Sequence, residues 1–233
     1  MRALLLANSY DADAGYVGER FAQLGYRFEL LARDEPSAWP PADGVDLVVQ
    51  LGSDWSVYWD HVSDGVEAEA ALCRMMSARG VPTFAICFGA QLHAYAHGGV
   101  VERSPAAEVG WYAVSSALPG PVQEGPWFQW HYDRFTAPPG AMQLATGPMG
   151  AQAYRMGRTL ATQYHPEVTP EMVARWSGSA GGLAELEKLA IDRDELMART
   201  VVICGSSRTR AHGLIDWFCE HVAGSTSRAE VGG

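Results

Sequence analysis

One short segment constrains the fold of this chain more than any other. Residues 83–86, Thr-Phe-Ala-Ile, read as a buried strand, and Cys87 follows at once, ahead of a helical pattern from Ala90 to His97. Small residues two positions on either side of the cysteine, Ala85 and Gly89, allow a tight turn. A strand that turns sharply into a helix at one reactive residue has the layout of a nucleophile elbow. This layout lifts the side chain out of the edge of a sheet.

The rest of the chain fits such a sheet. Apolar runs of about four to six residues alternate with amphipathic stretches, as in a parallel sheet covered by helices on both faces. Strands are expected at 4–7, 27–31, 47–51 and 83–86, and helices at 16–24, 65–79 and 90–97. Between residues 99 and 163 short strand-like pieces are broken by Pro and Gly, which predicts antiparallel or mixed pairing. We therefore predict a doubly wound α/β fold with a mostly parallel or mixed sheet and flanking helices.

The C-terminal part of the chain is expected to be helical. Helices are predicted at 170–176, 183–196 and 210–222, with Gly-Ser segments between them. No internal repeat or linker divides the chain, so residues 1–222 are expected to form one domain with a helical extension from about residue 171. Residues 223–233 are expected to form a disordered tail.

The amino-acid composition limits which cellular compartment and which binding partners can be expected for this chain. Lys and Arg number 17 against 27 Asp and Glu among 233 residues, a formal net charge of −10, so neither nucleic acid nor a membrane surface is an expected partner. The first apolar run is too short for a signal segment or a membrane span. The spacing of the four cysteines fits neither a disulfide framework nor a zinc ribbon. We therefore expect a cytoplasmic protein in which Cys73, Cys204 and Cys219 are structural.

A second motif supplies a base and an orienting carboxylate for Cys87. Residues 163–167 read Gln-Tyr-His-Pro-Glu, so a strand brings His165 to the sheet edge and the proline lets Glu167 reach the far nitrogen of the imidazole. The helix after Cys87 favours the thiolate, and the N–H of Phe88 is available to an oxyanion. A lone buried cysteine or a histidine before a proline is usually structural. The two motifs together predict a catalytic triad of Cys87, His165 and Glu167.

These motifs resemble the class I glutamine amidotransferase family, and within it stand-alone members similar to the amidase half of GMP synthetase. The resemblance extends from the first strand to about Trp176. It implies a flavodoxin-like architecture and hydrolysis of the side-chain amide of glutamine, through a thioester on the cysteine, with ammonia released for a synthetase or other biosynthetic enzyme. No cofactor is needed for this chemistry, and the ammonia acceptor is expected to be a separate chain.

The resemblance also implies roles outside the triad. The loop at residues 51–58 takes the place of the family's glycine-rich loop, so the oxyanion hole is expected to be formed by Gly52, Ser53 and Phe88. The residues expected to bind the substrate are Gln91, Trp130, His131 and Tyr132. The family usually has two glycines where this chain has Gly52 and Ser53, and a glycine at Ala85. Because Ser53 and Ala85 are larger than glycine, these differences affect how closely the pocket fits the substrate, whereas the Ser53 N–H can still act as a donor.

Three alternatives stay open. The same machinery serves a stand-alone γ-glutamyl hydrolase or peptidase that cleaves a γ-glutamyl conjugate. The same fold also serves a non-catalytic binding subunit. Finally, His93 and His97 have the i, i+4 spacing of two zinc ligands on a helix, but no third ligand of suitable spacing accompanies them. We therefore interpret them as polar residues of the helix and predict no metal site.

Overall fold

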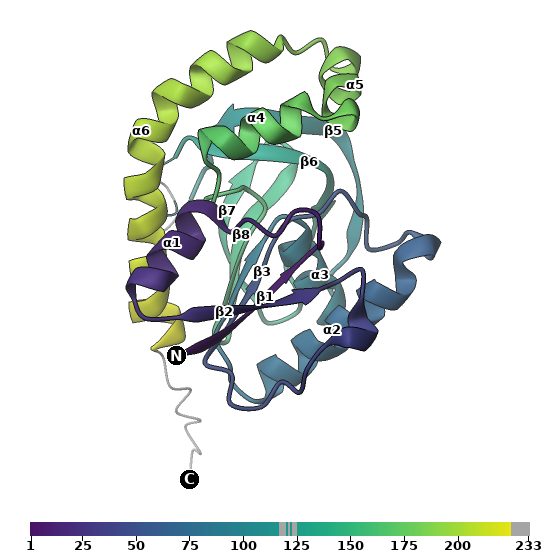
Figure 1. Cartoon of the computed structure of the whole chain (residues 1–233), viewed down its shortest axis with the longest axis vertical. Coiled ribbons are helices and arrows are strands. Elements are labelled where there is room, and N and C mark those ends of the chain that lie inside the picture. The colour runs from purple at the N-terminus through teal and green to yellow at the C-terminus, as the bar shows by residue number, and fades with distance from the viewer. Residues whose placement is uncertain (117–119, 121, 123–124, 225–233) are drawn as a thin grey trace.

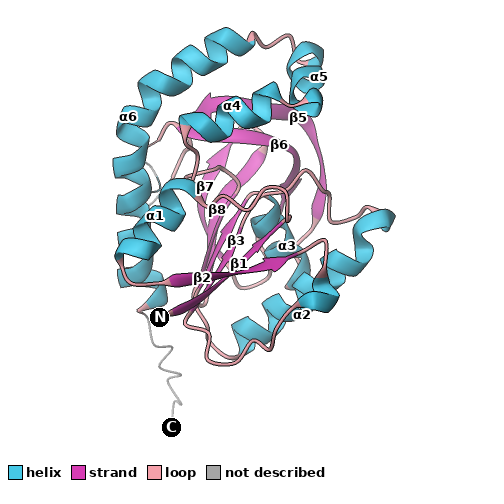
Figure 2. Cartoon of the chain, in the orientation of Figure 1, coloured by secondary structure: helices cyan, strands magenta, loops and turns pink. Residues whose placement is uncertain are grey.

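A computed structural model describes residues 1–116, 120, 122 and 125–224 of the chain. Its centre is a seven-stranded sheet with the order β2 (Arg27–Ala32), β1 (Arg2–Ala7), β3 (Leu47–Gln50), β4 (Thr83–Ile86), β9 (Thr159–Thr162), β8 (Gly150–Met156) and β7 (Met142–Gly147) (Figures 1 and 2). The first five strands in this order are parallel, and β8 and β7 are antiparallel. Strands β5 (Val101–Tyr112) and β6 (Trp127–Phe135) form a separate antiparallel pair. The predicted mixed sheet is confirmed.

Helices cover both faces of the sheet (Figure 1). They are α1 (Gly15–Gln23) and α6 (Arg193–Phe218) on one face and α2 (Ser63–Ala78) and α3 (Phe88–Ala96) on the other. Strand β1 carries apolar side chains on both faces of the sheet. Ala3 and Leu5 pack in the cluster that contains residues of α1 and α6, whereas Leu4 and Leu6 pack with Leu72 of α2. A strand buried on both faces carries an unbroken apolar run. The doubly wound α/β architecture is therefore confirmed.

The C-terminal helices differ from the prediction. They are α4 (Pro170–Gly178), α5 (Ala180–Lys188) and α6, which continues into a π-helical turn, η4 (Cys219–Ala223). The predicted helix 183–196 is wrong, because Ala190 has a φ of 54° and the Asp192 side chain caps a new helix by accepting a hydrogen bond from the Glu195 N–H. The predicted start at residue 210 is also wrong. Helix α6 runs through Gly205 because Cys204 and Ser207 on either side are buried.

Between residues 99 and 163 the sequence predicts strand-like pieces at 111–114, 127–130, 151–156 and 159–163. Two strand segments lie outside these predictions, β7 and the part of β5 before Trp111. Both segments pair antiparallel with a neighbouring strand. In β5, Pro105 and a register shift between Arg103 and Glu108 interrupt the alternation of buried and exposed residues that identifies a strand. The domain limits stay a prediction, although η4 extends to Ala223. Residues 225–233 of the expected tail lie outside the described residues.

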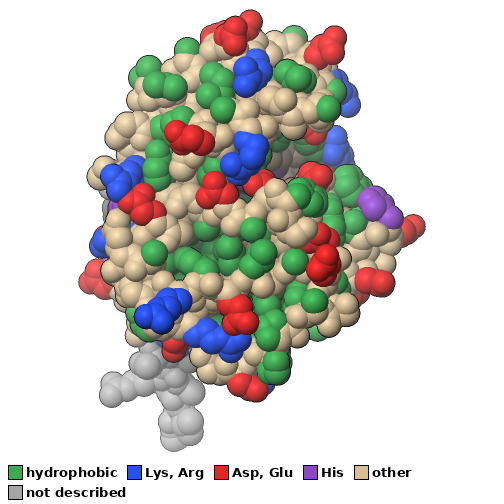
Figure 3. Space-filling view, viewed as in Figure 1, with side chains coloured by type: hydrophobic (Ala, Val, Ile, Leu, Met, Phe, Trp, Pro, Cys, Tyr) green, Lys and Arg blue, Asp and Glu red, His purple; other side chains and the backbone are tan. Residues whose placement is uncertain are grey.

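Two surface properties bear on partners. On the face shown in Figure 3, acidic and basic side chains are interspersed, with no broad basic area. Among the described residues, no helix is long and apolar enough to cross a bilayer.

Candidate active site

Cys87 occupies the sharp turn between β4 and α3. Its φ of 51° and ψ of −110° lie in a region that a non-glycine residue rarely adopts, and such strain persists only where the surroundings enforce it. The Cys87 N–H donates to the Thr162 carbonyl at 2.7 Å, which ties the turn to β9. A Cβ on Gly89 would lie 2.6 Å from the Gln50 carbonyl oxygen, so only glycine fits there. The geometry is that of the predicted nucleophile elbow.

His165 and Glu167 form a buried pair just beyond the end of β9. The Nδ1 atom of His165 lies 2.7 Å from Glu167 Oε1, and the His165 N–H donates to the Phe128 carbonyl at 2.8 Å. The Glu167 carbonyl accepts a hydrogen bond from the Tyr16 N–H at 2.9 Å, and a Cβ on Gly15 would lie 1.9 Å from that oxygen. The start of α1 therefore fixes the backbone that carries the carboxylate.

Gly52 lies between the imidazole and the cysteine. A Cβ placed on Gly52 would lie 2.9 Å from His165 Cε1 and 3.6 Å from Cys87 Cβ, so the loop after β3 packs against both. The Nε2 atom of His165 is buried and has no well-formed hydrogen bond among the described residues. Since Nδ1 is directed at Glu167, Nε2 is the nitrogen available to the thiol.

The surroundings of His165 favour its charged form. Burial alone would lower the pKa of the imidazole, but the negative charges of Glu167 and Cys87, with the hydrogen bonds they offer, hold that pKa well above its usual value. An imidazolium beside Cys87 stabilises the thiolate, as does the N-terminus of α3. The Cys87 sulfur also lies 3.6 Å from Gln163 Nε2, an amide donor. This arrangement suits a cysteine nucleophile.

Two peptide groups near the sulfur have the properties of an oxyanion hole. Phe88 is the first residue of α3, a position whose N–H has no acceptor within the helix. In the loop after β3, the Leu51 and Gly52 carbonyls accept hydrogen bonds from Arg33 at 3.0 and 2.9 Å. The Gly52 carbonyl and the Ser53 N–H belong to one trans peptide group and point in opposite directions. Because Arg33 binds the carbonyl, the Ser53 N–H points away from Arg33. The assignment of these N–H groups to an oxyanion hole stays a prediction.

Arg33 is a residue that sequence reasoning missed. Its guanidinium is fully buried and pairs with Glu69 of α2, with Arg33 Nε 3.0 Å from Glu69 Oε2. It also contacts Asn8 Oδ1 at 3.1 Å and lies 4.6 Å over the Phe88 ring. An arginine at the end of a predicted edge strand gives no sign of this role, because its partners come from four other segments.

Of the four predicted substrate-binding residues, Trp130 has a contact with the Cys87 sulfur, and the other three contact neighbouring side chains and backbone. Both amide hydrogens of Gln91 are engaged, with Nε2 3.3 Å from both the Asp133 carbonyl and Gln163 Oε1. The Trp130 carbonyl lies 3.9 Å from Cys87 Sγ, and its indole N–H donates to Glu185 of α5 at 2.7 Å. Gln91 therefore links the elbow to β6, while the backbone of Trp130 borders the sulfur. Substrate binding by either residue stays a prediction.

His131 and Tyr132 follow Trp130 on β6. His131 is buried, with Nδ1 3.0 Å from the Asp133 carbonyl and Nε2 3.1 Å from Glu108 Oε2. Arg103 lies 4.5 Å over the ring of Tyr132. Their predicted role in binding the substrate is not tested by these contacts. What the contacts show is that a buried polar pair, Glu108 and His131, joins β5 to β6.

Asp133 and Glu108 are two further buried acidic residues beside the site, and the sequence interpretation gave Asp133, with His131, the role of shaping the turn over the substrate. The Asp133 carboxylate accepts hydrogen bonds from Ser56 and from the Tyr58 hydroxyl, the latter at 2.8 Å. Glu108 accepts from Gln152 Nε2 at 2.9 Å. The sequence signal was present, because a charged residue inside an apolar strand needs a partner when it is buried.

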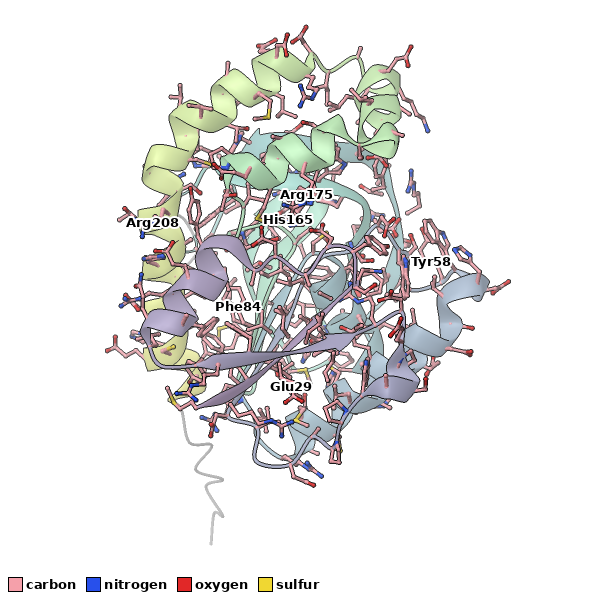
Figure 4. The ribbon with its side chains drawn as sticks, viewed as in Figure 1. Glu29, Tyr58, Phe84, His165, Arg175 and Arg208 are labelled. Carbon is pink, nitrogen blue, oxygen red and sulfur yellow. The ribbon has the colours of Figure 1, made fainter. Side chains whose placement is uncertain are left out.

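Aromatic side chains close the site from above. The Trp176 ring of α4 lies 5.3 Å from the His165 ring and 6.3 Å from the Trp130 ring, centroid to centroid. Figure 4 shows His165 below α4 in this view, and Arg175 is labelled on α4 itself. Asp11 holds α4 in place by accepting hydrogen bonds from Arg175 at 2.9 Å and from the Trp176 indole at 2.7 Å. Cys87, His165 and Glu167 are consequently only 4%, 5% and 2% exposed.

Comparisons with known proteins agree with this geometry. A family model described as glutamine amidotransferase class-I matches residues 60–174, a range that contains Cys87, His165 and Glu167. The crystal structure of a glutamine amidotransferase from Thermotoga maritima superposes with a TM-score of 0.83 at 26% identity, covering 97% of this chain and 99% of that one. The chain belongs to the class I glutamine amidotransferase family. The resemblance inferred from the sequence is therefore confirmed.

Sequence relatives of this amidotransferase chain include much longer proteins. A GMP synthase (glutamine-hydrolysing) from Aeropyrum pernix is 32% identical over 168 residues, which are 66% of this chain and 31% of the relative. One from Thermus thermophilus is 39% identical over 99 residues, 38% of this chain and 19% of the relative. The chain thus spans less than a third of these relatives. A glutamine amidotransferase structure from Methylobacillus flagellatus, 24% identical with a TM-score of 0.78 over 94% of each chain, shares the fold.

Proposed function

We propose that this chain is a glutaminase component that releases ammonia from the γ-carboxamide of glutamine for a separate synthetase. The observation that carries the proposal is the strained Cys87 beside a buried His165–Glu167 pair, with Gly52 in contact range of both cysteine and imidazole. A helix N-terminus, an imidazole and an amide donor around one sulfur support a nucleophile rather than an inert thiol.

In the proposed reaction, the Cys87 sulfur attacks the amide carbon and forms a C–S bond. The carbonyl π electrons move to oxygen, where the N–H groups of Phe88 and Ser53 stabilise the negative charge. His165 then donates its proton to the departing nitrogen, the C–N bond breaks and ammonia leaves. Glu167 keeps the imidazole in the required orientation throughout.

Water completes the cycle. The neutral His165 takes a proton from water as the water oxygen attacks the thioester carbon. Collapse of the second tetrahedral intermediate breaks the C–S bond, so glutamate leaves and the Cys87 thiolate and the imidazolium form again. Both half-reactions use the same oxyanion site, which is why one pair of backbone donors suffices.

The separate synthetase rests on the relatives. The GMP synthases that resemble this chain are named as glutamine-hydrolysing, and the chain matches only a part of each. We further propose that this partner regulates the site through α4, since Cys87, His165 and Glu167 are buried and Trp176 of α4 packs against His165.

The proposal is tested by measuring ammonia release from glutamine by the wild type, Cys87→Ala and, as a matched control, Cys204→Ala. Cys204 is also buried, but it lies on α6. We expect wild type and Cys204→Ala to hydrolyse glutamine and Cys87→Ala to lose the activity. A wild type that leaves glutamine intact yet cleaves a γ-glutamyl dipeptide would instead identify a γ-glutamyl hydrolase. Cys87 reacting with iodoacetamide no faster than the other three cysteines would favour a non-catalytic subunit.

A further inference from the structure

A second cysteine and histidine cluster lies between α2 and α3, on the side of the sheet away from α1 and α6. Cys73 comes from α2, His93 from the last turn of α3, and His97 is the residue that directly follows α3. One potential ligand atom from each residue lies within 4.8 Å of those from the other two. The sequence showed the two histidines one turn apart but not a third ligand. The packing of α2 on α3 supplies it, as Cys73.

The hydrogen bonds around both imidazoles leave the same nitrogen free. The Tyr154 hydroxyl donates to the Ala90 carbonyl at 3.2 Å, so its oxygen accepts from His93 Nδ1 at 2.8 Å. His97 Nδ1 lies 2.9 Å from the His93 carbonyl, which can only accept. Each Nδ1 therefore carries the proton, and each Nε2 keeps a lone pair. Partners that hold one ring nitrogen in this way are typical of metal-ligating histidines.

Burial makes these lone pairs unusual. His93 is 1% exposed, and its Nε2 has no hydrogen-bond partner among the described residues. A buried polar atom without a partner costs about 1–3 kcal/mol unless something satisfies it. Cys73 is also buried, and its Sγ makes a weak contact with Gln50 Oε1 at 3.9 Å. The two rings stack with centroids 4.3 Å apart, so their edges lie side by side.

We propose that Cys73, His93 and His97 bind one zinc ion, through the sulfur of Cys73 and the Nε2 atoms of both histidines. One thiolate and two imidazoles form a ligand set that zinc prefers, with water as the fourth ligand. Tetrahedral coordination places ligand atoms roughly 3.5 Å apart. Because the three atoms lie within 4.8 Å of one another, each pair closes by about 1.3 Å at most on binding. Cys73 loses its thiol proton to solvent as the Zn–S bond forms.

The position of the cluster determines what the ion does. His97 is half-buried, which gives the ion a route from solvent. Cys87 begins α3 and the two histidines lie near its other end, so zinc joins the nucleophile helix to α2 without contacting the triad. The site therefore stabilises the α2–α3 layer, and binding can be measured without any activity assay.

The test uses the Cys87→Ser protein, because the thiol and imidazole of the triad would otherwise take up zinc themselves. Zinc is titrated against a chromophoric chelator, and cobalt(II) is then bound in its place to show a thiolate-to-cobalt absorption band. We expect one equivalent of zinc, a thiolate band, and a higher melting temperature with zinc than with EDTA. Adding Cys73→Ser or His97→Ala should weaken zinc binding by at least about 100-fold and remove the zinc-dependent rise in melting temperature.

Matched controls are Cys204→Ala and His221→Ala, each added to Cys87→Ser, since both residues lie on other helices. These variants should bind zinc as the parent does. Circular dichroism confirms that each variant is folded, and half-buried His97 provides a second variant should the buried Cys73 position not tolerate serine. Absence of stoichiometric zinc in the parent, or zinc binding that survives both Cys73→Ser and His97→Ala, would overturn the proposal.

Discussion

Replacing Gly52 with alanine tests whether catalysis depends on contact between the loop and the imidazole. The new Cβ would lie 2.9 Å from His165 Cε1, and ordinary van der Waals contact begins near 3.4 Å, so the ring or the loop must move by about 0.5 Å. A misplacement of about 1 Å at a reacting group costs roughly 100-fold in rate, so we expect a fall in kcat of about tenfold, or about 1.4 kcal/mol. Overpacking costs only about 1–3 kcal/mol of stability, so the variant should still fold.

The assay is steady-state ammonia release, with a thermal melt of each protein in parallel. We expect a much smaller change in KM than in kcat, because the substitution displaces the imidazole rather than a group that holds glutamine. Gly205→Ala is the matched control, since a Cβ there meets nothing within 4 Å and the residue lies in α6. If Gly52→Ala retains the wild-type kcat, Gly52 does not position His165 and the proposed geometry is wrong.

Three further predictions concern the same site. Because the Glu167 charge raises the pKa of His165, Glu167→Gln should lower it, move the alkaline limb of the kcat/KM profile to lower pH, and reduce kcat by about 100-fold or more. An unchanged alkaline limb would contradict this role. Arg33→Met leaves Glu69 buried without its partner and should cost about 3–5 kcal/mol in urea unfolding, whereas adding Glu69→Leu should restore stability but not kcat. Restored kcat in that double variant would show that Arg33 acts only on stability. Gly89→Ala should melt far below the wild type, since its Cβ would meet the backbone of β3 at 2.6 Å, and a near-normal melting temperature would refute the tight elbow.

Two arrangements that the sequence predicts and the structure contains, the sharp turn at Cys87 and the contact of His165 with Glu167, depend on local chain geometry. The elbow at Cys87 requires a strand, small neighbours and a helix within ten residues, and all three can be identified by spacing. The pairing of His165 with Glu167 is equally local, because only one residue separates them. A parallel sheet then brings the two segments together, since β4 and β9 are adjacent and end at the same edge.

The parts that sequence reasoning missed are long-range. Arg33 reaches the oxyanion loop and Glu69 from the end of an edge strand, and nothing near it in sequence marks it as buried. Cys73 meets His97 only because α2 packs against α3. Helix α6 is a third case, because its buried face overrides the low helix propensity of Gly205. Single-sequence patterns report local preferences, whereas these features depend on tertiary packing.

The burial of Cys87, His165 and Glu167 explains why many of the side chains around them are charged and paired. A buried ionised group is tolerated only with an opposite charge and hydrogen bonds, and the site holds imidazolium character on His165 between two acidic groups, Glu167 and Cys87. Arg33 and Glu69 of α2 form a second buried pair of opposite charges close to the site. Low dielectric strengthens these interactions and also makes each broken pair costly. Under the proposed function, groups that never touch glutamine therefore also contribute to ammonia release, because they keep the backbone donors and the imidazole in place.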